Sequence, residues 1–299
     1  METRCLMKDR RTRLLLLHDS PHMTRPLLGK LLQIDTSLHY PFSRTAAQLA
    51  ETLSIPLSRA QSILRHITDP NIMKKLDIYI HKYTIITVFD HTYPKCLKTI
   101  PDPPYVLYTV GDVSLFHTPL SISVVGTRKP SAYAFPAMKS VLIPIIQSGF
   151  TIVSGMAQGI DQFAHTLADD YNGKTIAVLG SGFQHIYPKN NPSLYYRLTQ
   201  KHLVVSEYPP DCPPKKYHFP ERNRLISGLT PSTFVIEARL KSGTLITVDQ
   251  ALEQGKDVYA LPGPAGRVTS EGCHKMINEG AKLVHTYHDI LEDWLEKFE

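Results

Sequence analysis

Hydrophobic residues recur with two different periods in two parts of the chain. Between about residues 13 and 70, apolar side chains return every three or four positions, as in LLGKLLQI, TAAQLAETLSI and LSRAQSILRHI. This spacing predicts short amphipathic helices, with Ser43 and Ser58 as caps and Pro41 and Pro56 as breaks. We therefore predict a small helical domain over residues 1–75. Such bundles include DNA-binding modules as well as plain interaction or spacer modules, and the pattern leaves both open.

From Leu120 onward the pattern changes to short apolar strands that alternate with helical segments. The strands are ISVVG, TIVSG, TIAVLG, LVVSE, TFVIEA and DVYALPG, most of them closed by glycine or an acid. This alternation predicts right-handed βαβ crossovers and a mostly parallel sheet with helices on both faces. The expected fold class is therefore α/β, with a second domain over residues 76–299. Ligands of such sheets bind at the carboxyl ends of the strands.

The composition favours an anionic partner and a reducing compartment. The 299 residues carry 33 Lys and Arg against 27 Asp and Glu, a formal net charge of +6. The four cysteines, Cys5, Cys96, Cys212 and Cys273, are far apart, which predicts neither disulfides nor a structural zinc site. The four leucines at 14–17 are too few for a signal peptide or a membrane span. We therefore predict a cytoplasmic protein that does not enter a membrane.

The segments that follow the strands are rich in glycine, serine, threonine and basic residues. Glycine lets backbone N–H groups approach a phosphate closely, and a helix that begins behind the loop adds partial positive charge. Because the carboxyl ends of parallel strands share one edge, these loops are expected to form one groove suited to phosphates. The loops are residues 126–129, 154–161, 180–182 with 187–191, 219–224, 241–244 and 261–263.

Neither a dinucleotide cofactor nor metal chemistry is predicted for this groove. Gly180-Ser181-Gly182 begins like a dinucleotide fingerprint and Glu207 closes the next strand, but His185 replaces the third glycine. No phosphate-binding P-loop motif with its lysine, no HExxH and no paired cysteines occur. Asp161 and Glu237 are the carboxylates nearest the loops, and Asp161 is expected to brace its own loop. We predict no cofactor, no metal and no catalytic residue.

The stretch KKYHFPERNRLISGL has the composition of a single-strand binding segment. Arg222 and Arg224 offer cations for the DNA backbone, and Phe219 offers a ring for stacking. The alternative is that Phe219 belongs to the core and the arginines pair with Glu221 or Glu207.

At these motifs the sequence resembles the DNA-processing protein A family, also called DprA or Smf. The matching pieces, in order between about residues 75 and 285, are VGTRKPS, SGMAQGID, VLGSG, YPKNN, SEYPP, FPERNRLISGL, KSGTLIT, ALPG and EGCHKMINEGA. His274 stands where this family usually has Asn. The ending HDILEDWLEKFE is too short for the winged-helix domain that some members carry, so a DNA-binding role of that domain is not expected.

The resemblance implies an extended Rossmann-like domain behind a helical SAM-like domain. It also implies a homodimer without catalytic activity that binds single-stranded DNA during natural transformation (competence), protects it and helps load RecA recombinase. The implied side-chain contacts are Arg128, Lys189, Phe219, Arg222 and Arg224. With the loop residues, the candidate DNA contacts are Gly126, Thr127, Arg128, Ser154, Gly155, Gly159, Gly180, Ser181, Gly182, Lys189, Asn191, Phe219, Arg222, Asn223, Arg224, Ser242, Gly243 and Thr244.

An enzyme is the alternative function. Related Rossmann-like nucleoside-monophosphate phosphoribohydrolases carry a glutamate three residues after a Gly-Thr pair, where it stabilises an oxocarbenium-like ribosyl centre. Here Gly243-Thr244 is followed at that distance by Thr247, and the closest carboxylate in sequence is Asp249.

Overall fold

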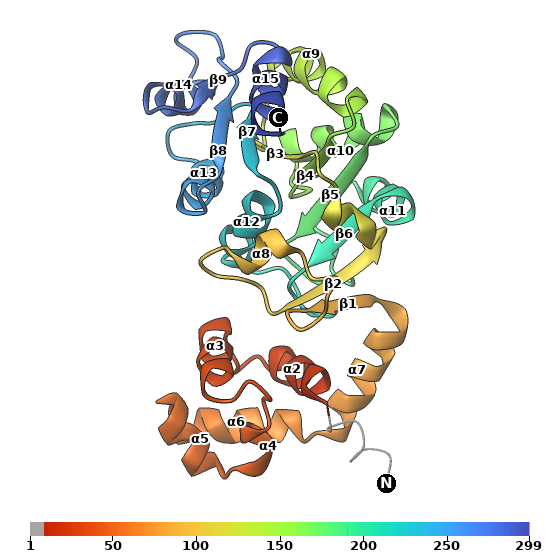
Figure 1. Cartoon of the computed structure of the whole chain (residues 1–299), viewed down its shortest axis with the longest axis vertical. Coiled ribbons are helices and arrows are strands. Elements are labelled where there is room, and N and C mark those ends of the chain that lie inside the picture. The colour runs from red at the N-terminus through yellow and green to blue at the C-terminus, as the bar shows by residue number, and fades with distance from the viewer. Residues whose placement is uncertain (1–8, 190, 299) are drawn as a thin grey trace. The chain divides into compact units, whose positions relative to one another are not determined.

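The computed structural model describes residues 9–189 and 191–298, which fold into two compact units (Figure 1). The first unit ends at Tyr93 and also takes in Pro104–Tyr108; the second comprises Pro94–Pro103 and the chain from Thr109 onward. The boundary predicted between residues 75 and 76 lies inside helix α7 (Pro70–Lys82). As a division into domains it stays a prediction.

The first unit is helical, as the three-to-four-residue spacing predicts, and it also contains strand β1 and the first residues of β2. Leu14 to Leu17 are buried, which explains the run of four leucines as helix core. The predicted caps are wrong: Thr45 caps α5, where a Gln48 side chain completes a capping box, and Pro56 precedes α6, so Ser43 and Ser58 lie within helices. The other elements are α2 (Arg10–Asp19), α3 (Arg25–Ile34), α4 (Tyr40–Ser43), α5 (Ala46–Leu53), α6 (Leu57–Ile67), β1 (Thr84–Thr87) and β2, which begins at Val106 and ends at Gly111.

The second unit contains seven neighbouring strands in the order β6-β5-β4-β3-β7-β8-β9. Every pair among them is parallel, so their carboxyl ends face one edge. The order reverses at β3, which pairs with β4 on one side and with β7, far along the chain, on the other (Figure 1). The strands are β3 (Ser121–Val125), β4 (Thr151–Ser154), β5 (Lys174–Leu179), β6 (Leu203–Ser206), β7 (Ser232–Val235), β8 (Asp257–Ala260) and β9 (Lys282–Leu283).

Helices pack on this sheet through a continuous apolar core. Its centre joins Ile122 and Ile152 of the sheet to residues of α9, α10 and the last helix, α15. Trp294 of α15 is buried, and its ring meets the edge of Phe150 at a centroid distance of 4.9 Å, so α15 packs on its own chain. The helices are α8 (Lys95–Lys98), the 3₁₀ helix η1 (Val113–His117), α9 (Ala134–Gln147), α10 (Ile160–Asp170), α11 (Pro192–Lys201), α12 (His218–Gly228), α13 (Gly243–Glu253), α14 (Glu271–Asn278) and α15 (His288–Phe298).

Among the described residues, no helix is both long and apolar enough to span a bilayer. Cys96 and Cys273 are free thiols, while Cys5 lies outside the described residues. The cytoplasmic location predicted from the sequence stays a prediction.

Candidate nucleic-acid interface

An open pocket of about 660 Å³ lies at the carboxyl ends of the central strands, and we call it the strand-end pocket. It lies beside β3, at the point where the strand order reverses, as expected for parallel sheets. Its lining residues are Val125, Gly126, Thr127, Arg128, Ala157, Asp161, Tyr187, Lys216, Phe219, Pro220, Arg222, Asn223, Ile226, Ser242, Gly243, Thr244, Ile246 and Thr247. The structure thus brings together half of the predicted contacts.

The loop after β3 is held at both ends and presents Arg128 to solvent. The Thr127 amide donates to the backbone oxygen of Glu237 (2.8 Å), and the Glu237 carboxylate accepts from the Ser131 amide (2.8 Å). Gly159 makes close packing possible, because it adopts φ +90° and a Cβ there would lie 2.5 Å from the Thr127 oxygen. Arg128 is exposed, with its guanidinium 5.6 Å from the centroid of the Phe219 ring.

Asp161, at the start of α10, braces the loop after β4, as its sequence position predicts. Its carboxylate accepts from the amides of Gly155 (3.2 Å) and Ala157 (3.3 Å). Burial raises the pKa of Asp161 to about 6, although the nearby Arg222 guanidinium and the two amides act in the opposite direction. The pocket wall therefore carries a carboxylate whose charge can change near neutral pH.

Arg222, in the second turn of α12, is a buried cation that joins the loop after β4 to strand β5. Its side chain is 4% exposed and donates to the backbone oxygens of Gly155 (2.5 Å) and Val178. Glycine at position 155 leaves room for this guanidinium, because a Cβ there would lie 2.5 Å from the guanidinium carbon and would displace it. Burial lowers the pKa of Arg222 to about 10, so the group stays charged at neutral pH. Most of its hydrogen-bonding capacity is used inside the protein, although its surface reaches the pocket.

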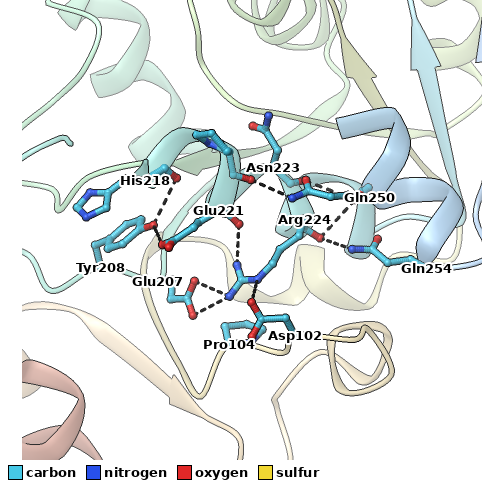
Figure 2. A network of polar contacts seen from close by, with 12 residues as sticks. Asp102, Pro104, Glu207, Tyr208, His218, Glu221, Asn223, Arg224, Gln250 and Gln254 are labelled. Atoms are coloured by element: carbon cyan, nitrogen blue, oxygen red, sulfur yellow. Dashed lines mark hydrogen bonds and ion pairs between the residues drawn. The ribbon is translucent and has the colours of Figure 1, made fainter. Parts of the chain in front are cut away.

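Arg224 lies in a different environment, shown in Figure 2. Its guanidinium binds both Glu207 carboxylate oxygens (2.9 and 2.8 Å) and one of Asp102 (3.2 Å), and it is 5% exposed. It does not line the strand-end pocket. An ion pair with Glu207, the alternative that the sequence left open, is therefore present. A contact between Arg224 and DNA stays a prediction.

The other predicted loop residues support the pocket from behind or lie outside its lining. Ser154 is buried and donates to the Val124 oxygen (2.6 Å), and Ser181 donates to the His185 oxygen (2.8 Å). The Gly182 amide donates to the Cys212 oxygen (2.8 Å), and Asn191 caps α11. Lys189 is exposed and does not belong to the lining. Their roles as DNA contacts stay predictions.

At the start of α13 the pocket wall offers polar groups to a ligand. This helix receives no side-chain cap, and the buried Ser242 hydroxyl has no hydrogen-bond partner among the described residues. Uncapped amides at a helix start, with its partial positive charge, favour an anion. Thr247 also lines the pocket, so a hydroxyl lies where the phosphoribohydrolase motif would place a carboxylate, and Asp249 is not part of the lining.

Nine of the lining residues, Lys216 and Tyr187 among them, were not among the candidate contacts from the sequence. Lys216 is exposed, and a signal existed in the KK pair before YHFPERNR. Tyr187 pairs with Phe219 at a centroid distance of 5.1 Å, a contact that sequence spacing does not reveal.

A second cavity of about 60 Å³ lies at the same rings and is lined by Arg128, Gly155, Ala157, Gln158, Gly180, Tyr187, Pro188, Phe219 and Arg222. Within residues 9–189 and 191–298, no group of three or more His, Cys, Asp or Glu could hold a metal.

Comparisons with known proteins agree with this geometry. The family model for DNA recombination-mediator protein A matches residues 84–295. The chain is 42% identical over 212 residues to DNA processing protein DprA of Bacillus subtilis, 71% of each chain. It is 38% identical over 267 residues to protein Smf of Escherichia coli, which covers 89% of this chain and 68% of that protein.

Two solved structures are similar over most of the chain. The X-ray structure of DNA processing protein A from Streptococcus pneumoniae has a TM-score of 0.82 at 35% identity and covers 92% of this chain and 95% of its own. DNA processing protein A from Helicobacter pylori, whose structure concerns its single-stranded DNA binding mode, has a TM-score of 0.66 at 30% identity, over 73% and 98%. The first likeness confirms the predicted α/β fold with a mostly parallel sheet.

Proposed function

The chain belongs to the DNA recombination-mediator protein A family, as its motifs predict, and from this premise we propose that it binds single-stranded DNA in the strand-end pocket. The observation that carries the proposal is the charge of the pocket wall. Arg128, Lys216 and Arg222 supply three cations, whereas Asp161 supplies one carboxylate. An anionic chain is the ligand that this wall fits.

The three cations act differently. Arg128 and Lys216 are exposed and can reach phosphate oxygens directly, whereas Arg222 contributes its charge from behind and fixes the loops around it. The α13 amides and the Ser242 hydroxyl add donors without a fixed charge. Because amides and cations contact the backbone and not the base edges, little sequence preference is expected.

We propose further that the bound strand is protected and delivered to the RecA recombinase in natural transformation, and that the protein acts as a homodimer without catalysing a reaction. The family's description as a recombination mediator supports the partner, and the relative from Helicobacter pylori, described as binding single-stranded DNA, supports the ligand. A phosphoribohydrolase, the alternative function, would need a glutamate at the position that Thr247 occupies in this chain.

Fluorescence anisotropy with a labelled oligonucleotide tests the proposal. The protein should prefer single strands to duplex and should not release the oligonucleotide when AMP is added as a competitor. Its affinity should fall steeply with salt, with a slope of log binding constant against log salt concentration of about −0.7 per neutralised phosphate. Arg128→Ala should lower affinity and reduce the slope by about one such step. Displacement of the oligonucleotide by low AMP, or no binding at all, would instead favour a small-nucleotide enzyme.

A further inference from the structure

We propose that Tyr187, and not Phe219, is the ring on which a base of the bound strand stacks. The inference rests on the proposed function and adds to it the position of the base. It changes the sequence-based expectation, in which Phe219 was the stacking residue.

The Phe219 ring is already covered by its own protein. The Arg128 guanidinium lies 5.6 Å from its centroid, within the range of a cation–π contact. The backbone of Gly180 approaches it closely, since a Cβ on Gly180 would come within 3.0 Å of the ring. Tyr187 covers part of what remains, with the ring centroids 5.1 Å apart and the planes inclined by 51°. A base that stacked on Phe219 would have to displace one of these neighbours.

Tyr187 is the outer member of the aromatic pair. It is 40% exposed, whereas Phe219 is half-buried. Its ring contacts Phe219 at an inclination of 51°, so it is held by a neighbour while part of its surface meets solvent. A supported but exposed aromatic ring is what base stacking requires, because every base has a flat face and stacking needs no hydrogen-bond code.

The position of Tyr187 also fits the course of a strand. Tyr187, Phe219, Arg128 and Arg222 line both the 660 Å³ strand-end pocket and the 60 Å³ cavity, so the pair stands where the two spaces meet. Arg128 lies against the same pair, which places a cation for a phosphate next to a ring for a base. A nucleotide has these two groups side by side, and single-strand binding sites pair cations with aromatic rings for this reason.

The test compares a normal oligonucleotide with one that carries abasic residues, in the full-length protein. If a base stacks on Tyr187, removing bases should weaken binding to the wild type, and Tyr187→Ala should weaken binding to the normal oligonucleotide by about 5- to 100-fold. The variant should bind the abasic oligonucleotide like the wild type, and its salt slope should be unchanged. Tyr187→Phe should bind normally, whereas Tyr187→Leu, which keeps bulk but lacks the ring, should be weak.

Tyr171 is the matched control, because it is also 40% exposed and ends α10, away from the pocket lining. Tyr171→Ala should leave both affinities unchanged. If Tyr187→Ala weakens binding to both oligonucleotides equally, the residue acts on loop shape and the inference is wrong. It is also wrong if Tyr187→Ala binds normally while Phe219→Leu, shown to be folded, loses sensitivity to the missing bases. In both cases a strong effect of Arg128→Ala would leave the proposed function standing.

Discussion

Arg128 and Arg222 line the same pocket and yet perform different physical tasks. Arg128 is exposed on a loop and rests on the Phe219 ring. Arg222 is almost fully buried in the second turn of a helix and donates to backbone oxygens of the loop after β4 and of strand β5. The residue that offers its charge to a ligand is therefore distinct from the residue that holds the loops.

A cation in a binding motif therefore need not be a contact. A buried charge must be paired or hydrogen-bonded, and removing it leaves its partners buried and unsatisfied. An exposed arginine has no buried partners to leave unsatisfied. Its removal should therefore lower DNA affinity and leave the free energy of unfolding almost unchanged. Substitutions at these positions should therefore separate binding from stability.

Arg222→Ala should destabilise the fold by about 3–5 kcal/mol, because it leaves the oxygens of Gly155 and Val178 and the Asp161 carboxylate without their buried partner. Urea denaturation followed by circular dichroism measures the change. Arg128→Ala is the control and should stay within about 0.5 kcal/mol of the wild type. If the two variants were equally stable, Arg222 would not be a structural cation.

Gly159→Ala should cost about 1–3 kcal/mol for the strained backbone at φ +90°, plus the clash with the Thr127 oxygen at 2.5 Å. Gly149 provides a matched control, since it also adopts φ +90° but has no atom within 4 Å of an added Cβ. The difference in unfolding free energy between the two alanine variants isolates the clash. DNA affinity should fall only for Gly159→Ala, because only that clash displaces the loop that carries Arg128.

Lys216→Ala should reduce the salt slope of single-strand binding by about 0.7, the contribution of one phosphate, and lower affinity accordingly. Its neighbour Lys215 is also exposed but does not line the pocket, and its ammonium lies 5.7 Å from the centroid of the Tyr217 ring. Lys215→Ala should therefore have the smaller effect. Equal effects from both lysines would mean that general positive charge, and not the pocket, binds the strand.

Asp161 gives the smallest expected effect. Its pKa of about 6 means that the carboxylate is ionised at pH 7 and becomes neutral as the pH falls through 6. Neutralisation removes a repulsion toward phosphates, so affinity should rise as the pH is lowered from 7 to 5. The gain is about 0.5 kcal/mol for charges ~8 Å apart in water-like surroundings. Asp161→Asn keeps an oxygen acceptor for the loop amides and should lose this contribution to the pH dependence, which titrations at several pH values would show.

The sequence predicts the sheet and the position of the pocket because both depend on local patterns. Apolar strands that alternate with helices specify parallel pairing, and glycine at Gly126 and Gly155 marks places where chains approach closely. The helix caps of the first unit were harder to predict, because Ser43 and Thr45 are both good capping residues and two positions apart.

The burial of the arginines could not be predicted from spacing. The Arg222 partners lie 67 and 44 residues away along the chain, and Glu207 lies 17 residues from Arg224. Only tertiary packing decides that both cations of FPERNR are buried, and which partners each one meets. The contact of Tyr187 with Phe219 could not be predicted for the same reason, since it joins the loop after β5 to helix α12, which lie far apart in the sequence.

The two hydrogen bonds that Arg222 donates to backbone carbonyl oxygens also affect how fast a DNA strand can bind. They hold the loop after β4 against strand β5 before any DNA arrives. A site that needs no ordering step loses little entropy on association and does not wait for a rearrangement. The association rate should then be set by diffusion and by long-range attraction from the exposed cations, so salt should act mainly on this rate. The residence time should depend on the short-range contacts inside the pocket.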